Sequence, residues 1–548
     1  MVGKVLSVMT RPIQGLHEAA YVLAGFSVLS QVLALLRDRS FAHFFGAGPT
    51  LDAYFAAFRI PDLVFAFLTL FVSSFALVPL LSVREEKAQG LLVGNVLFAF
   101  GAVAVLASAL LWFLMPLVVP VLFPGFSEAL MAQTVELSRI MLLQPVLLGL
   151  SSIAASLIQV LRRFLIYALA PILYNLGIIF GTIVLYPELG IAGLGWGVVL
   201  GALLHFIVQA LSVLGHARHI TMPTLSSLRD SVVEVALPSV PRALALSSQQ
   251  VLLLMFASIA SLTSTGTIAV LSLASNLQSV PLTVIGISYA AALFPALAAL
   301  IAKQDHATFV KEVWASIRHV IFWTMPAIVL MIVLRAHIVR IILGSGEFSW
   351  SDTRLTAAVL ALFAISLIAQ SAILIFSRAY YAARMSLIPI VLNIGGTLAA
   401  GVAAYGGVMW LMQADFARHF IESLLRVDDV SGTTVLMIPL AYSAVMIGTA
   451  CLFAYFFARQ FGKDDRVGQT LGMSFAASVI GGGAAYAVLA FLGPYLPVAT
   501  FLGLLSQTVL AGVAGLAAWG ITLYLLKSQE FKEVLAMLSQ KLGFPIGT

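Results

Sequence analysis

The chain has 548 residues, of which 61% are hydrophobic and only 9% are charged. A soluble domain carries about 25% charged residues, so this composition excludes an ordinary water-soluble protein and indicates one that crosses a membrane. The formal net charge of +6 could suggest a nucleic-acid partner, but the cations are scattered between hydrophobic segments and form no basic stripe. Cys451 is the only cysteine, which excludes an internal disulfide and a cysteine-rich metal site.

Hydrophobic runs broken by glycine, proline or charge predict an all-α membrane protein with about fourteen transmembrane helices. In chain order the runs lie near 17–45, 51–82, 89–122, 130–161, 164–186, 190–215, 231–263, 267–302, 307–334, 352–383, 385–412, 434–461, 468–493 and 498–527.

The loops between these spans carry most of their Lys and Arg on one side, including Arg84, Arg163 and Lys303. The positive-inside rule assigns that side to the cytoplasm. An even number of spans brings both ends of the chain to the same side, so we expect both termini in the cytoplasm. The polar stretch at 413–432 contains ADFARHFIESLLRV, which fits either a helix at the membrane interface or a solvated connecting helix.

The chain resembles itself at two places. FALVPLL, which contains Pro79, recurs as AALFPAL with Pro295. APILYNLG, which contains Asn175, recurs as IPIVLNIG with Asn393. The two offsets, 216 and 218 residues, are nearly equal, which indicates an internal repeat.

Six spans in each repeat would give both copies the same orientation in the membrane. That arrangement predicts two pseudo-symmetric six-helix lobes around a central cavity. We expect an N-terminal lobe at 1–219, a C-terminal lobe at 220–462, and an appendage at 463–548 with two further spans and a cytoplasmic tail.

The first two spans carry charges well inside their hydrophobic segments. The turn GAGPT places Arg37, Asp38, Arg59 and Asp62 at a similar depth, roughly 12 Å below the outer end. Each buried charge costs at least about 2.5 kcal/mol, so these side chains should face protein or a watery cavity. One interpretation pairs Arg37 or Arg39 with Asp62, and Asp38 with Arg59. The other is a cationic site for an anionic headgroup, and the two are compatible.

Arg242 lies roughly 16 Å deep in the seventh predicted span. It could approach Arg37 across a cleft between the lobes, where two or three arginines would suit a pyrophosphate. Local pairing with Glu234 is the alternative. Glu136 and Arg139 stand three residues apart, which is the spacing of a structural ion pair on one helix face.

Patterns typical of enzymes are missing from this sequence. GLGWG at 193–197 and GGG at 481–483 lie inside apolar segments, where small residues allow close helix packing. The sequence contains no Walker A motif, and its nine histidines are dispersed, which argues against a metal site. We therefore expect neither catalysis nor a cofactor, with a monovalent ion or the membrane potential as a possible driving force.

Four longer stretches resemble the MurJ/MviN family of lipid II flippases, within the multidrug/oligosaccharidyl-lipid/polysaccharide exporter superfamily. They are RDRSFAHFFGAGPTLDAYFAAFRIPDL, RRFLIYALAPILYNLGII, GSGEFSWSDTRLTAAVL and RAYYAARMSLIPIVLN. By this resemblance Arg37 matches an arginine implicated in binding the lipid-linked pyrophosphate. Asp52 matches a functionally important aspartate, to which we assign a role at a gate, with Asp38 and Asp62 as gating or pairing groups.

The sequence also departs from the family pattern at cavity positions. Gln31 stands where the family usually has another arginine, and Phe65 and Ala66 replace a basic pair. Asn276 and Ser279 stand where an arginine and a glutamate are common. Our hypothesis is that two other arginines of this chain, Arg59 and Arg242, compensate as substrate-binding groups.

The resemblance implies an inner-membrane flippase that moves lipid II, the undecaprenyl-pyrophosphate-linked peptidoglycan precursor, to the outer leaflet by alternating access. The expected partners are this lipid, the bilayer and cell-wall synthesis enzymes, with the chain acting as a monomer. One alternative is a sister flippase for another polyprenyl-pyrophosphate-linked saccharide, or a small-molecule exporter of the same superfamily. A non-transporting scaffold for envelope-synthesis enzymes is the other.

Overall fold

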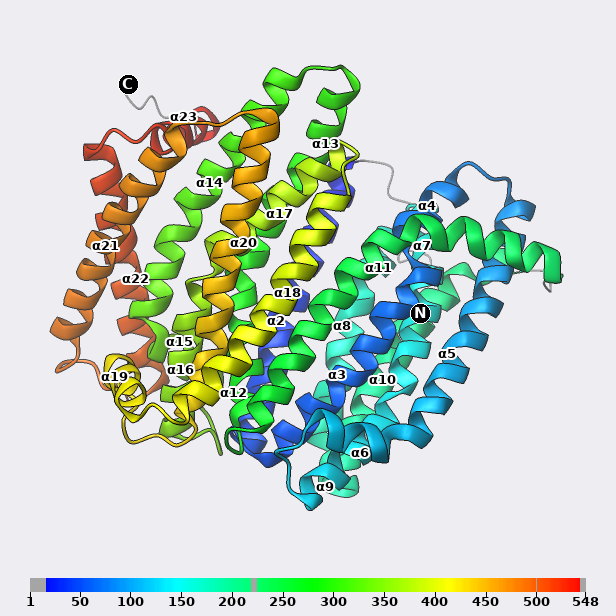
Figure 1. Cartoon of the computed structure of the whole chain (residues 1–548), viewed down its shortest axis with the longest axis horizontal. Helices are drawn as coiled ribbons and strands as arrows, with labels where there is room; N and C mark the ends of the chain where they lie inside the picture. Colours follow the sequence, from blue (N-terminus) through cyan, green and yellow to red (C-terminus); the bar gives the residue numbers. More distant parts are fainter. Residues whose placement is uncertain (1–15, 218–223, 499, 543–548) are drawn as a thin grey trace. The chain divides into compact units, whose positions relative to one another are not determined.

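The computed structural model describes residues 16–217, 224–498 and 500–542, and every regular element in these ranges is a helix (Figure 1). This confirms the all-α fold. In chain order the helices are α2 (Leu16–Phe45), α3 (Pro49–Val72), α4 (Ser74–Ser82), α5 (Glu86–Leu122), α6 (Glu128–Met141), α7 (Leu143–Val160), α8 (Phe164–Phe180), η1 (Gly181–Leu185), α9 (Tyr186–Leu189), α10 (Ile191–Ala217), α11 (Leu225–Ser261), α12 (Thr267–Pro281), η2 (Leu282–Ile287), α13 (Ser288–Ala302), α14 (His306–Val333), α15 (Arg335–Leu343), α16 (Trp350–Ala364), α17 (Leu367–Ala382), α18 (Leu387–Leu411), α19 (Asp415–Leu425), η3 (Thr433–Leu436), α20 (Met437–Phe461), α21 (Arg466–Leu492), α22 (Phe501–Leu525) and α23 (Gln529–Leu542).

Within the described ranges, twelve helical segments are long and apolar enough to cross a membrane. A thirteenth is added if α16 and α17, which meet at an angle of 42°, form one bent span. Among the described side chains of the 37-residue α11, the apolar segment that stands out is Ser247–Ser261, which is shorter than a full span. The count is therefore close to the fourteen expected, and whether α11 also crosses stays a prediction.

The first hairpin shows how local sequence ends one span and starts the next. The chain turns at Gly46, whose φ of +58° suits glycine, and the Gly46 amide donates to the Ala42 carbonyl at 2.9 Å. Pro49 then opens α3, where its fixed φ and missing N–H suit the first helical position. The result is a tight turn between α2 and α3.

Contacts divide the chain into two compact units. The first unit runs to Ala269 and includes Ser345–Phe348, and the second contains Val270–Gly344 and the chain from Ser349 onward. In the first unit α11 packs along α3 and α5, and Val235 of α11 joins the buried core. The lobe boundary expected from the sequence repeat, at 219/220, differs from the boundary at Ala269 that the contacts give. The two-lobe division therefore stays a prediction.

Helix interruptions occur at corresponding places in the two halves of the chain. Ser73 separates α3 from α4 shortly before Pro79, and the π-helical turn η2 precedes α13 with its Pro295. Likewise Leu142 separates α6 from α7, and a break follows Ala364 between α16 and α17. The repeated motif that contains Pro79 and Pro295 therefore lies in similarly interrupted spans.

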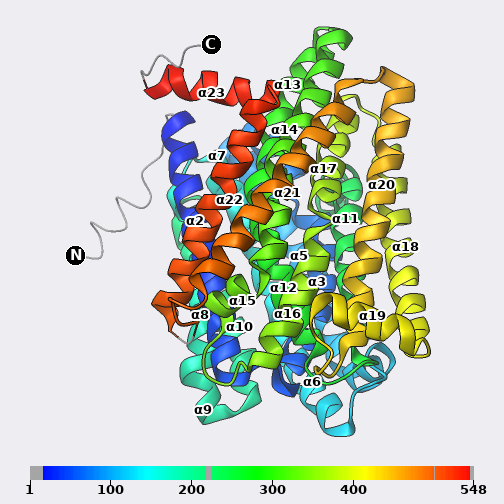
Figure 2. The same ribbon diagram turned by 90° about the vertical axis from the view of Figure 1, so that its left-hand side faces the viewer.

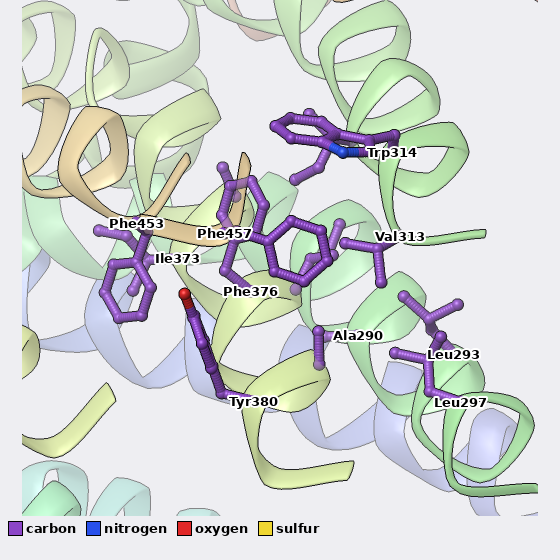
Figure 3. Packing of buried hydrophobic residues seen from close by; sticks show 14 of the residues in the cluster. Ala290, Leu293, Leu297, Val313, Trp314, Ile373, Phe376, Tyr380, Phe453 and Phe457 are labelled. Atoms are coloured by element: carbon purple, nitrogen blue, oxygen red, sulfur yellow. The ribbon is translucent and has the colours of Figure 1, made fainter. Parts of the chain in front are cut away.

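In the second unit, an aromatic core joins α14, α17 and α20 (Figure 3). The Trp314 ring meets the Phe376 and Phe457 rings edge-on, with centroids 5.5 and 5.7 Å apart. Trp314 also donates its indole N–H to the Gly462 carbonyl at 2.9 Å. Such edge-to-face contacts add to the gain from burying the rings.

Glycines allow the closest helix contacts, as the sequence predicted for GLGWG and GGG. A Cβ on Gly197 would lie 2.6 Å from the Cα of Gly181, and one on Gly481 would lie 2.6 Å from the Gly515 carbonyl oxygen. The second contact joins α21 and α22, which run side by side in both views (Figures 1 and 2). These interpretations are confirmed.

Candidate functional site

Arg37 is held in a fixed orientation by two neighbours of the first unit. Its Nε and Nη2 donate to Oδ1 of Asp38 at 3.0 and 2.8 Å, and its Nη1 donates to Oδ1 of Asn175 at 3.1 Å. Asp38 is 2% exposed, whereas the Arg37 side chain keeps 19% of its surface. Asp38 thus accepts from the adjacent Arg37, a pairing that the sequence did not predict, while the expected pairing of Asp38 with Arg59 stays a prediction.

Asp62 lies on α3 and interacts with groups of α2, α3 and α7. The Gln144 amide donates to Oδ1 of Asp62 at 3.2 Å, and the charges of Arg59 and Arg37 both act on this carboxylate. Buried charges are tolerated when they are paired and hydrogen-bonded, so each of these groups offsets the burial of another. We call Arg37, Asp38, Arg59, Asp62, Gln144 and Asn175 the arginine cluster.

The arginine cluster keeps part of its donor capacity for a ligand. A guanidinium has five N–H donors in a planar fork, and the three bonds above use three of them. Within the described part of the chain, one N–H therefore stays unused on each terminal nitrogen of Arg37. Two such donors match the geometry of two oxygens on a phosphate.

A polar cavity of about 530 Å³ lies in the same unit, between α2, α3, α4, α7, α8 and α10. Its polar lining includes Ser27, Ser30, Thr69, Ser73, His205 and Gln209. These side chains carry hydroxyl, amide or imidazole groups, and none is a carboxylate, an ammonium or a guanidinium. The sequence did not reveal this cavity, because neutral polar residues on five different spans form no local pattern.

Asp52 lies at the start of α3 and is 1% exposed. Its Oδ1 accepts from the Ala269 amide at 2.9 Å and its Oδ2 from the Gly266 amide, at the N-terminus of α12. A carboxylate is favoured there by the orphan N–H groups and the positive end of the helix dipole. Asp52 thus ties the α2–α3 turn to the start of α12, while its gating role stays a prediction.

At the opposite end of α11, Glu234 is paired with Arg84. Nη2 of Arg84 lies 2.6 Å from Oε1 and 2.7 Å from Oε2 of Glu234. The alternative partner Arg242 lies on α11, but its side chain falls outside the described side chains, and its predicted role stays a prediction.

Several other sequence-predicted positions have local roles or open surroundings. Arg139 packs 4.4 Å over the Trp112 ring and donates to the Trp112 carbonyl at 2.9 Å, a contact that sequence spacing did not predict. Ser279 donates to the Asn276 carbonyl at 2.7 Å in the second unit. Ala66 is buried and Gln31 is partly exposed. Their roles in substrate binding remain predictions.

Sequence reasoning missed the neutral members of the arginine cluster. Asn175 was visible only as part of the repeated motif APILYNLG, and Gln144 had no signal. In the described part of the chain, no group of three His, Cys, Asp or Glu side chains could hold a metal ion. The expectation of no cofactor is not tested by that observation.

Comparison with known proteins gives consistent matches. A family model described as "Lipid II flippase MurJ" matches residues 41–506. The lipid II flippase MurJ of Burkholderia cenocepacia is 26% identical over 408 residues, which cover 71% of this chain and 78% of that protein. The probable lipid II flippase MurJ of Buchnera aphidicola is 27% identical over 373 residues, which cover 66% and 73%.

Solved structures agree at the level of the fold. A lipid II flippase MurJ in an inward closed conformation superposes with a TM-score of 0.73 at 20% identity, covering 93% of this chain and all of that one. An inward-facing multidrug resistance transporter of the MATE family gives a TM-score of 0.62 at 14% identity, covering 83% and 99%.

Proposed function

This chain belongs to the lipid II flippase MurJ family, and from that premise we propose that it moves lipid II across the cytoplasmic membrane for peptidoglycan synthesis. The observation that supports this most directly is the Arg37 guanidinium, which Asp38 and Asn175 hold inside a membrane-spanning unit through three of its five N–H donors. Ionisable groups at such depth are costly and usually serve a substrate pathway.

The proposed mechanism uses Arg37 to bind the pyrophosphate of the lipid. Asp38 and Asn175 fix the plane of the guanidinium, so its two remaining N–H groups are oriented before the substrate arrives. Arg59, with Asp62 beside it, supplies a second cation to the same region. Alternating access then exposes this site first to the cytoplasm and then to the outer side, with no catalytic step.

The driving force and the orientation are parts of the same proposal. The excess of Lys and Arg in one set of loops supports an inner-membrane protein with both termini in the cytoplasm. In that orientation an inside-negative potential favours outward movement of an anionic headgroup. Each elementary charge that crosses 100 mV gains about 2.3 kcal/mol. We also propose that the chain works as a monomer and hands its lipid to cell-wall synthesis enzymes.

A flipping assay tests the proposal. The purified protein would be placed in vesicles that contain lipid II, and its outward movement would be followed. We expect Arg37→Ala to reduce the rate about ten- to hundredfold, the scale of one or two charge-assisted hydrogen bonds. Arg37→Lys should retain part of the rate because it keeps the charge without the fork. Arg139→Ala, which alters an arginine that packs on Trp112, is the control.

The altered cavity positions favour a second candidate, a sister flippase for another polyprenyl-pyrophosphate-linked saccharide. Gln31 and Ala66 carry no charge where the family resemblance implies cations. Competition in the same vesicles between lipid II and an O-antigen-type lipid would separate the two substrates. A scaffold that transports neither lipid would show full complementation of growth by Arg37→Ala.

A further inference from the structure

The polar cavity of the first unit shares helices α2 and α8 with the arginine cluster. Ser30 lines the cavity and Arg37 lies seven residues later on α2, so the two share a helix face and lie roughly 10 Å apart. Pro171 lines the cavity on α8, and Asn175, which accepts from Arg37, follows one turn later. Two helices therefore independently place Arg37 within about two helix turns of the cavity.

Two buried polar groups of the cavity wall have no hydrogen-bond partner in the described part of the chain. Gln209 is 1% exposed, and its Oε1 has no hydrogen-bond partner within the described chain. Ser73 is 6% exposed, and its Oγ likewise has no partner there. A buried polar group without a partner costs about 1–3 kcal/mol. Ser73 also interrupts the span between α3 and α4, and interrupted spans of transporters commonly line substrate sites.

The remaining lining matches a neutral, hydroxyl-rich ligand. Ser151 lies 2.7 Å from Nδ1 of His205, which leaves the second ring nitrogen of His205 for another partner. Aromatic and apolar side chains, such as Phe26 and Tyr167, complete the wall. Ligand pockets commonly combine an apolar wall with a few placed polar groups and have volumes of about 300–1,000 Å³, a range that includes this cavity.

We propose that this cavity binds the saccharide of the lipid-linked substrate while Arg37 binds its pyrophosphate. The inference rests on the proposed function. It assigns the saccharide of the headgroup to the cavity and the pyrophosphate to Arg37. The roughly 10 Å between Ser30 and Arg37 suits a sugar joined directly to a diphosphate. The uncharged lining discriminates by hydroxyl positions and not by charge.

Binding of the saccharide can be distinguished from binding of the pyrophosphate by comparing two lipids. Native mass spectrometry of the full chain would measure binding of lipid II and of undecaprenyl pyrophosphate, which has no saccharide. We expect Gln209→Met and Ser30→Val each to weaken lipid II binding about tenfold, near 1.4 kcal/mol, and to leave undecaprenyl pyrophosphate within twofold. Arg37→Ala should weaken both lipids. Thr397→Val, a similar hydroxyl deletion in the second unit, is the control.

The outcomes are distinct. If the unaltered protein binds no lipid II, the proposed function fails. If it binds lipid II and both cavity variants bind the two lipids unchanged, or lose both equally, the cavity is not a saccharide site and the proposed function still stands. Ser30→Val keeps the test decisive if Gln209→Met does not fold, because Ser30 is only partly buried.

Discussion

Asp52 illustrates how one residue joins two segments that are more than 200 positions apart. Its carboxylate accepts from the Gly266 and Ala269 amides and is 1% exposed. Removing such a cap costs about 0.5–2 kcal/mol, so we expect Asp52→Ala to lower the thermal unfolding temperature in detergent. Asp52→Asn should fall between, because it keeps one acceptor oxygen. Unchanged stability combined with lost lipid flipping would instead favour the gating role.

Gly266 supplies the backbone conformation of the same junction. Its φ is +89°, and a Cβ there would lie 2.1 Å from the Ala47 carbonyl oxygen. Gly190 also has a positive φ, +58°, but a Cβ at that position would meet nothing within 4 Å. At Gly190→Ala only backbone strain opposes folding, which costs roughly 1–3 kcal/mol. We expect Gly266→Ala to destabilise the protein by clearly more, because it adds the clash with the Ala47 carbonyl. Equal losses in thermal unfolding would mean that the α2–α3 turn moves to make room.

At the scale of elements, α19 presents one face to protein and another outward. Glu422 is buried and accepts from Thr433, and Arg354 donates to the carbonyl of Arg426, where the helix ends. The residues facing outward include Phe416, Phe420 and Leu424, which are 88%, 62% and 67% exposed. Since spans α18 and α20 flank this segment, the pattern favours the interfacial alternative over the solvated one.

A depth measurement decides between the two alternatives for α19. In a Cys451→Ser background, we expect a fluorophore on Leu424→Cys to be quenched by lipid-borne quenchers. The same fluorophore on His419→Cys, on another side of the helix, should be quenched much less. Equal, weak quenching at both positions would establish a solvated connecting helix.

The C-terminal helix α23 is attached through Glu530. Its carboxylate accepts from Thr470 at 2.8 Å and Ser528 at 3.1 Å and lies 3.3 Å from Nε of Arg318. Burial is the largest influence and raises the pKa of Glu530, but the hydrogen bonds and the Arg318 charge together outweigh it and lower the pKa below its ordinary value.

Because the pKa of Glu530 is lowered in the folded state, the ionised carboxylate stabilises the attachment of α23. This stabilisation is fully present at pH values above the ordinary carboxyl pKa, which is about 4. This contribution is lost as the pH falls through the lowered pKa. We expect hydrogen exchange to show α23 protected at pH 7 and increasingly open below about pH 4. Glu530→Gln should weaken protection at pH 7 and flatten this pH dependence. An unaltered profile in that variant would assign the attachment to other groups.

Particular elements show what sequence can and cannot predict. The predicted spans at 51–82 and 190–215 match the observed Pro49–Ser82 and Ile191–Gly215, because apolar runs end at clear breaks. The interruption at Leu142 was not predicted, since the apolar run continues through it. Arg37 and Asp62 were found because charge is costly in lipid, whereas Asn175 and Gln144 carry no charge and come from distant helices.

For the whole molecule, the number of crossings depends on α11. At 1.5 Å per residue its 37 residues extend about 55 Å, well beyond the roughly 30 Å hydrocarbon core, but its first half carries Arg229, Asp230 and Glu234. The pairing of Glu234 with Arg84 gives one of these charges a partner. If α11 crosses and the bent pair α16–α17 counts as one span, the described chain has fourteen crossings.

Cysteine labelling in intact cells tests this topology. In the Cys451→Ser background, Thr224→Cys and Thr265→Cys place exposed thiols just before and just after α11. We expect a membrane-impermeant maleimide to label Thr265→Cys from outside and to reach Thr224→Cys only after permeabilisation. Labelling of both from the same side would remove the α11 crossing and leave thirteen. The two termini would then lie on opposite sides, and the proposed cytoplasmic position of both ends would be wrong.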